Sequence, residues 1–269
     1  MSKRQRNISI AIFAFIIFLL VFGIALTGGA SEKSETIQQV MKDEVLHEKQ
    51  KIDFLFFGKV NPGLVSAVTV TVLITLFAII VRIFAIPKFK IIPGKFQMLL
   101  EQAVGMFDNL SKTNSPSRNK FLGGYVFAAG TYIFLGTIFE LFGFQAVSQN
   151  KTSVALPAPL SDINAAIALG VLSYVVILSG GIISNGLRGA GRVLKDFSLP
   201  VSMSFRLFGA LLSGALVTEL VYYYTKLSFV LPVIVGVLFT LLHAFIQAYV
   251  LTMLTALFYG EATEKNEKR

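Results

Sequence analysis

Arg206 is the residue whose chemistry is most unusual for its position in this sequence. Its neighbours are uncharged from Phe197 to Phe205 and from Leu207 to Thr218. A guanidinium stays charged under physiological conditions, and placing one near the centre of a bilayer costs about 2.5–3.5 kcal/mol on insertion scales. Charged groups at such depth face other charged groups or a water-filled path. Arg206 is therefore the first candidate for a functional residue.

Small side chains surround this arginine if its segment is helical. At 100° per residue, one stripe holds Arg206 together with Ser202, Gly209, Ala210, Ser213 and Val217. Small residues permit close contact with a neighbouring helix and leave a path beside the charge. The alternative is that Arg206 marks a helix end and extends its side chain to the membrane surface.

Other polar side chains interrupt the apolar segments nearby. His243 and Gln247 are one turn apart near the C-terminus, and Glu140 and Glu219 are the intramembrane acids. An amide can hydrogen-bond a guanidinium on a facing helix, and an imidazole changes protonation near neutral pH. We consider these residues candidates for an ion pathway. The alternative is that Gln247 and His243 only bond neighbouring helices.

The elements that must position these residues are membrane helices. The chain has 269 residues, of which 54% are hydrophobic and 14% charged, and its mean hydropathy is +0.71. A helix needs about 20 apolar residues to cross the hydrocarbon core, and several stretches are that long. We predict an all-α polytopic membrane protein with about five to six membrane helices. The last two form a long, tilted hairpin, because residues 227–260 exceed a perpendicular span.

The predicted organisation has four parts. Residues 1–30 are a signal peptide or an extra N-terminal membrane helix, and 31–61 form an external polar arm. A membrane domain covers 62–260, and 261–269 form a cytoplasmic tail. The predicted helices of the membrane domain are about 62–86, 121–144, 163–187, 197–224 and 229–259.

The charge distribution indicates topology rather than a nucleic-acid partner. The net charge is +9, and basic residues gather in loops 87–120 and 188–196, whereas 27–61 is balanced. The positive-inside rule places the two basic loops and the C-terminus in the cytoplasm. The sequence has no cysteine, no metal motif and no glycine-rich phosphate loop. We therefore expect no cofactor, no metal and no ATP chemistry on this chain, which leaves its status as an enzyme open.

Two runs resemble the a subunit of F-type ATP synthases. One is Pro200-Val-Ser-Met-Ser-Phe-Arg206-Leu-Phe-Gly-Ala-Leu-Leu-Ser-Gly214, and the other is Ala244-Phe-Ile-Gln247-Ala-Tyr-Val-Leu-Thr-Met-Leu-Thr255. Weaker likenesses are Pro93-Gly-Lys-Phe-Gln-Met-Leu-Leu-Glu101 and Ser161-Asp-Ile-Asn164. The likeness covers roughly residues 60–260 in order.

The resemblance implies a stator subunit that lies against a rotating c-ring. Two half-channels would lead ions, with a proton the expected ion, to and from the carboxylates of the ring. Arg206 would match the essential arginine between the half-channels, and Gln247 the glutamine that supports it. The implied ring contacts are Ser202, Gly209, Ala210, Ser213 and Gly214. The implied ion-pathway residues are Glu219, His243, Glu140, Asp162 and Asn164.

Departures from the family pattern fall along the access pathway. The family's usual polar residues are replaced by Ala210 and Ala215, and its polar position seven before the glutamine is Thr240. Glu219 and His243 each lie about one turn beyond these sites, so we hypothesise that this pair rebuilt the pathway one turn along. Glu140 stands where the family commonly has asparagine.

The resemblance also implies partners and a location. The partners are the c-ring, the peripheral-stalk b subunits and the other ATP synthase subunits, all in a bacterial inner membrane, with no nucleic acid. The alternative function is a stand-alone ion channel or secondary transporter that uses an Arg/Glu pair. The lack of internal repeats counts against this alternative.

Overall fold

The computed structural model describes residues 36, 38, 52–53, 59–116, 120–147, 153–223 and 231–264. Five helical segments in this part are long and apolar enough to cross a membrane, which confirms the all-α polytopic class. They are α3 (Pro62–Ile80) with its extension to Lys88, α5 (Lys120–Phe139), α6 (Ile163–Lys195), α7 (Ser198–Tyr223) and α8 (Leu231–Thr263). The expected N-terminal unit and most of the polar arm lie outside the described residues.

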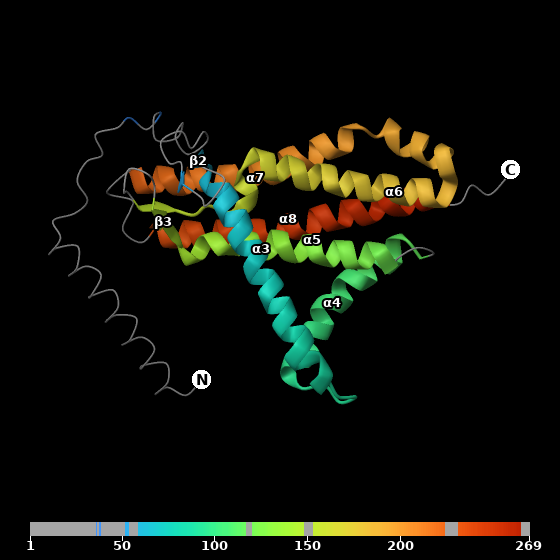
Figure 1. The fold of residues 1–269 in the computed structure, drawn as a ribbon. Coiled ribbons are helices and arrows are strands. Elements are labelled where there is room, and N and C mark those ends of the chain that lie inside the picture. Colours follow the sequence, from blue (N-terminus) through green and yellow to red (C-terminus); the bar gives the residue numbers. More distant parts are fainter. Residues whose placement is uncertain are drawn as a thin grey trace, which may run out of the picture.

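Helices α5, α6, α7 and α8 lie side by side, and α3 crosses them obliquely (Figure 1). A further helix, α4 (Lys95–Asn114), returns from the far end of α3 toward α5, so that α3 and α4 form a V. Helix α8 packs against α4, α5, α6 and α7. This arrangement makes α8 the central element, with α7 beside it.

Helix α4 differs from the expectation of a loop over residues 87–120. The segment combines good helix formers with an amphipathic pattern, and Ser111 and Phe107 on its inner face pack against α5. Its charged residues led the sequence analysis to assign a loop, although charges on one face are typical of an amphipathic helix. Lys95 and Lys112 of this region therefore lie on a helix.

Helix α6 reverses its direction at Gly186. Gly186 has φ 61° and ψ −143°, a conformation that residues with a Cβ rarely adopt. Beyond this turn the chain runs back along itself, because the Tyr174 hydroxyl donates to the Val193 carbonyl at 3.1 Å. The expected basic loop 188–196 is consequently helical as far as Lys195, and it leads directly into α7.

Two other glycines, Gly170 and Gly260, lie where helices come into close backbone contact. A Cβ on Gly170 would lie 2.9 Å from the carbonyl oxygen of Pro200 on α7. A Cβ on Gly260 of α8 would collide with the carbonyl oxygen of Asn114 at the end of α4. These contacts fix how far α7 and α8 can slide along their neighbours.

Two short antiparallel strand pairs precede α3 and α6. Strand β1 (Ile52–Asp53) pairs with β2 (Lys59–Val60), and β3 (Gln145–Val147) pairs with β4 (Ser153–Ala155). The second hairpin occupies part of the expected external loop 145–162. The short helical turn Pro159–Ser161 then leads into α6.

The core between the helices is built from apolar side chains of four helices. Leu122, Val126 and Ile133 of α5 are fully buried, as is Ile177 of α6. They join a cluster with α7 and α8 whose members are Met203, Leu207, Leu211, Ala248, Leu251 and Tyr259. Many large apolar side chains point outward instead, as expected for a protein surrounded by lipid.

Candidate functional site

Arg206 lies on the face of α7 that points away from the other helices of the chain. Its side chain is exposed, as are Ser202, Gly209 and Ser213, while Ala210 and Gly214 are half-buried. Met203 and Leu207, each one residue after a member of this stripe, are buried in the core. Arg206 forms no hydrogen bond or ion pair with another described residue. The arginine is thus presented, with small neighbours, to whatever lies beside α7.

Gln247 faces the base of Arg206 from the adjacent helix α8. The two residues line one small recess together with Met203, Leu207, Val250, Leu251 and Leu254. Gln247 is only 5% exposed, and the recess leaves no room for a water molecule between these side chains. The structure therefore brings together the two residues that the sequence motifs singled out, in one narrow and mostly apolar recess.

A second cavity lies further along the α7–α8 seam, toward the end of α8 that begins at Leu231. Glu140 from the turn after α5 lines it together with Thr240 and His243 of α8. Leu211, Gly214 and Ala215 of α7 and Thr137 of α5 complete the wall. The sequence analysis missed Thr137, although it lies one helical turn before Glu140. The cavity is small, about 10 Å³, and polar.

The hydrogen bonding of His243 defines which nitrogen can react. Its Nδ1 lies 2.8 Å from the carbonyl oxygen of Phe239, one turn earlier on α8. A carbonyl only accepts, so Nδ1 carries the hydrogen, and Nε2 holds the lone pair in the neutral ring. His243 is therefore oriented with one nitrogen available to take up a proton.

Asp162 and Asn164 do not line this cavity. Asp162 is the N-cap of α6, where its side chain accepts from the Asn164 backbone N–H at 2.8 Å. Its second oxygen accepts from Nδ2 of Asn61, the N-cap of α3, at 2.7 Å. Asp162 is buried, whereas the Asn164 side chain is exposed. The structure places this pair in a bridge between two helix starts, and an ion-pathway role for it stays a prediction.

The proposed partnership of Glu219 with His243 is not tested. Glu219 lies on α7 one turn beyond Ala215, which lines the cavity, but its side chain lies outside the described part of the structure. The described acid that shares the cavity with His243 is Glu140.

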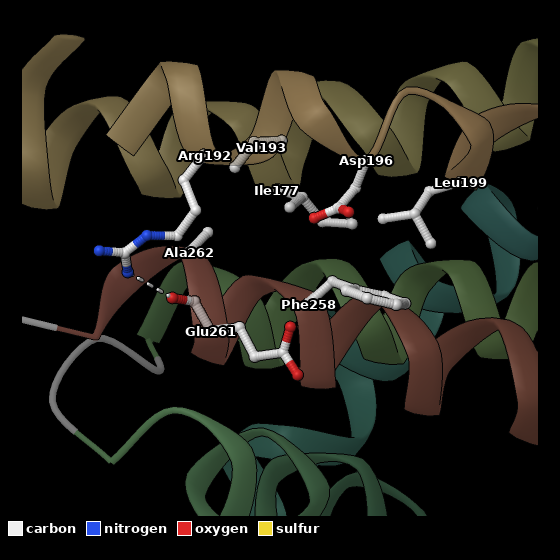
Figure 2. A pocket seen from close by; sticks show the side chains of 8 residues that line it. All are labelled: Ile177, Arg192, Val193, Asp196, Leu199, Phe258, Glu261 and Ala262. Carbon is white, nitrogen blue, oxygen red and sulfur yellow. Dashed lines mark hydrogen bonds between the residues drawn. The ribbon is translucent and has the colours of Figure 1, made fainter. Parts of the chain in front are cut away.

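A third cavity, of about 50 Å³, lies at the opposite end of the seam (Figure 2). Arg192 and Asp196 line it from the returning part of α6 and the turn into α7, and Glu261 lines it from α8. The guanidinium of Arg192 donates to the backbone carbonyl of Glu261 at 3.3 Å (Figure 2). The sequence analysis missed this cavity, because its charged residues were counted only as markers of topology.

These three places follow one another along the two helices. From one end of the seam to the other, α7 contributes Leu199, then Arg206, then Gly214, while α8 contributes Phe258, then Gln247, then His243. Successive positions on α7 are separated by about two helical turns, or roughly 10 Å. A narrow recess that Arg206 lines thus lies between two cavities that charged side chains line.

An exposed cation within a membrane-spanning helix, between two cavities lined by charged side chains, is typical of a membrane protein that handles ions. The family model described as ATP synthase A chain matches residues 64–260. The chain therefore belongs to the ATP synthase A chain family. It is an a subunit of the F-type ATP synthase membrane sector, a multi-pass membrane protein that takes part in ion translocation.

Proposed function

We propose that this chain is the stator of the rotary motor and that it conducts protons through two half-pathways. The half-pathways meet a ring of carboxylate-bearing c subunits along the exposed face of α7. The observation that carries this proposal is the narrow recess shared by Arg206 and Gln247, which lies between two cavities lined by charged or titratable side chains. A continuous channel through the seam would dissipate the gradient, whereas an interrupted one forces each ion to travel on the ring.

The external half-pathway would pass through Glu140 and His243. These groups line the cavity beside Gly214 and Ala215, where the side chains of α7 are small enough for a ring to approach closely. Nε2 of His243 would accept a proton from the Glu140 side, and the resulting imidazolium would release it toward the ring carboxylate. The cavity holds two titratable side chains, Glu140 and His243, which suits the transfer of a proton.

Arg206 would keep the approaching ring carboxylate ionised. A cation within about 4–6 Å of a carboxylate favours its charged form. A carboxylate that reaches Arg206 would therefore release its proton into the half-pathway that it is leaving. Gln247 would hold the guanidinium without neutralising it, because an amide oxygen accepts a hydrogen bond but carries no charge.

The second half-pathway would end at the cavity lined by Asp196 and Glu261. The positive-inside rule assigns this end to the cytoplasm, since Arg188, Arg192 and Lys195 gather there. The proposed partners are the c-ring and the peripheral-stalk b subunits. The proposed location of the complex is a bacterial inner membrane.

Replacement of Arg206 by alanine tests the proposal. The complex that contains Arg206→Ala is reconstituted into vesicles, and ATP-driven proton pumping is measured by a pH-sensitive dye. We expect the complex to assemble and pumping to fall to background, because nothing then discharges the ring carboxylates. Arg82→Ala, on the exposed end segment of α3, removes the same side chain away from the seam and should retain pumping. Normal coupling in Arg206→Ala would contradict the assigned role.

A further inference from the structure

The turn between α3 and α4, residues 89–94, presents two isoleucines entirely to the surroundings. Ile91 is 103% exposed and Ile92 is 85% exposed. In Figure 1 this turn forms the tip of the V, away from α5, α6, α7 and α8. Phe84, Phe96 and Leu99 beside the turn are also exposed. The chain itself does not cover this apolar tip.

The tip is surrounded by cations. Residues 82–100 contain Arg82, Lys88, Lys90 and Lys95 and no acid. All four cationic side chains are exposed. Glu101, the next acid along the chain, accepts a hydrogen bond from Gln97 at 2.7 Å. The surface at the turn between α3 and α4 is therefore apolar at its tip and is flanked by cationic side chains.

The conformation of this turn is held by a side chain of α4. Oε1 of Gln97 accepts from the backbone N–H of Lys90 at 3.0 Å, and Nε2 of Gln97 donates to the carbonyl of Lys90 at 2.8 Å. Both backbone groups at Lys90 are thus satisfied within the chain. The tip is a formed structure before any partner arrives.

The position of the tip along α3 identifies its surroundings. Helix α3 begins at Pro62, and a helix advances about 1.5 Å per residue, so the helix as far as Arg82 is about as long as the hydrocarbon core is thick, roughly 30 Å. Residues after Arg82 therefore lie at the level of the lipid headgroups. At this level lysines extend to phosphates while apolar side chains enter the acyl region.

We propose that the α3–α4 turn is a binding site for anionic phospholipids on the side of the membrane that carries the basic residues. Ile91 and Ile92 enter the leaflet, and Lys88, Lys90 and Lys95 contact the headgroups. Anionic lipids fit better than a protein partner, because the cores of protein interfaces are depleted in lysine. Each lysine near an anionic surface favours binding about fivefold. The site is separate from the seam and does not depend on the proposed ion pathway.

The composition of the chain makes this proposal directly measurable. The sequence contains no tryptophan, so Ile92→Trp introduces a single fluorophore at the tip. The full chain is reconstituted in phosphatidylcholine vesicles, and the quenching of this tryptophan is measured with brominated phosphatidylglycerol or brominated phosphatidylcholine. We expect quenching by both lipids, with phosphatidylglycerol several-fold more effective at equal mole fraction. High salt should weaken this preference.

Two further variants separate charge from position. In Ile92→Trp with Lys88→Gln, Lys90→Gln and Lys95→Gln, we expect the ratio of the two quenchers to fall to about one. Lys112→Gln, which removes a lysine paired with Asp108 on α4, should leave the ratio unchanged. Leu73→Trp, on the outward face of α3, reports that the chain is inserted, and it should show no headgroup preference.

The outcomes decide the proposal. Quenching that prefers phosphatidylglycerol, with this preference lost in the triple glutamine variant, supports it. A tryptophan at 92 that no brominated lipid quenches, while the one at 73 is quenched, overturns it. Equal quenching by the two lipids in the chain with all its lysines also overturns it. If position 92 becomes buried only when partner subunits are added, the proposal is overturned as well.

Discussion

Glu140 and His243 come from different helices, yet they line the same cavity within reach of the exposed face of α7. The sequence motifs predicted the pairing of Arg206 with Gln247, because each residue sits in a recognisable run. They did not predict the pairing of Glu140 with His243. A contact between the end of α5 and the middle of α8 depends on tertiary packing, and the sequence analysis matched His243 with Glu219 because both are displaced by one turn.

We predict that Glu140→Gln and His243→Gln each reduce proton flux through the reconstituted complex by roughly 100-fold, the low end of what a positioned proton-transfer group contributes. The double variant should be no slower than the slower single variant, because both groups act in one pathway. Dye-monitored pumping of assembled complexes measures this.

Ser179→Ala, a half-buried hydroxyl of α6 that does not line the cavities described above, is the matched control and should keep its flux. Independent, multiplying losses in the double variant would show that the two residues do not share a pathway.

At the scale of the elements, the reversal of α6 at Gly186 determines where α7 begins. The apolar runs predicted both helices, and the glycines predicted their close contact at Gly170. The turn itself was not predictable, because a glycine inside an apolar run is equally typical of helix packing. Only the backbone conformation distinguishes the two uses.

We expect Gly186→Ala to lower the free energy of unfolding by about 1–3 kcal/mol, because alanine is strained at this φ and ψ. Gly191→Ala, five residues later in open helical surroundings, should instead raise it by up to about 1 kcal/mol. Unfolding in detergent mixtures, followed by circular dichroism, measures both. Equal effects of the two substitutions would argue against strain at residue 186.

A second element-scale prediction concerns the bridge between the starts of α3 and α6. Asp162→Ala removes an N-cap and its bond to Asn61, and should lower the free energy of unfolding by about 1–2 kcal/mol. Asp162→Asn keeps a capping oxygen and should pump at the normal rate once assembled. Loss of flux in fully assembled Asp162→Asn complexes would instead place this carboxyl in the ion pathway.

For the whole molecule, hydropathy was sufficient to predict the class and the membrane helices, because long uncharged runs have few alternatives. It was insufficient for α4, whose charges resemble those of a loop, and for the cavity of Arg192, Asp196 and Glu261. That cavity forms only because α6 folds back beside the end of α8 (Figure 2). Residues brought together by such a reversal carry no shared motif.

The contact of Gly260 with the end of α4 has a consequence for the register of the whole seam. The three places on α7 recur at intervals of about two turns, so a slide of α8 along α7 would change which of its side chains lies nearest Arg206. The bare backbone of Gly260 against Asn114, together with the 3.3 Å bond between Ser115 and Thr263, opposes such a displacement. A methyl group at residue 260 would meet the Asn114 carbonyl oxygen and push α8 away from the end of α4.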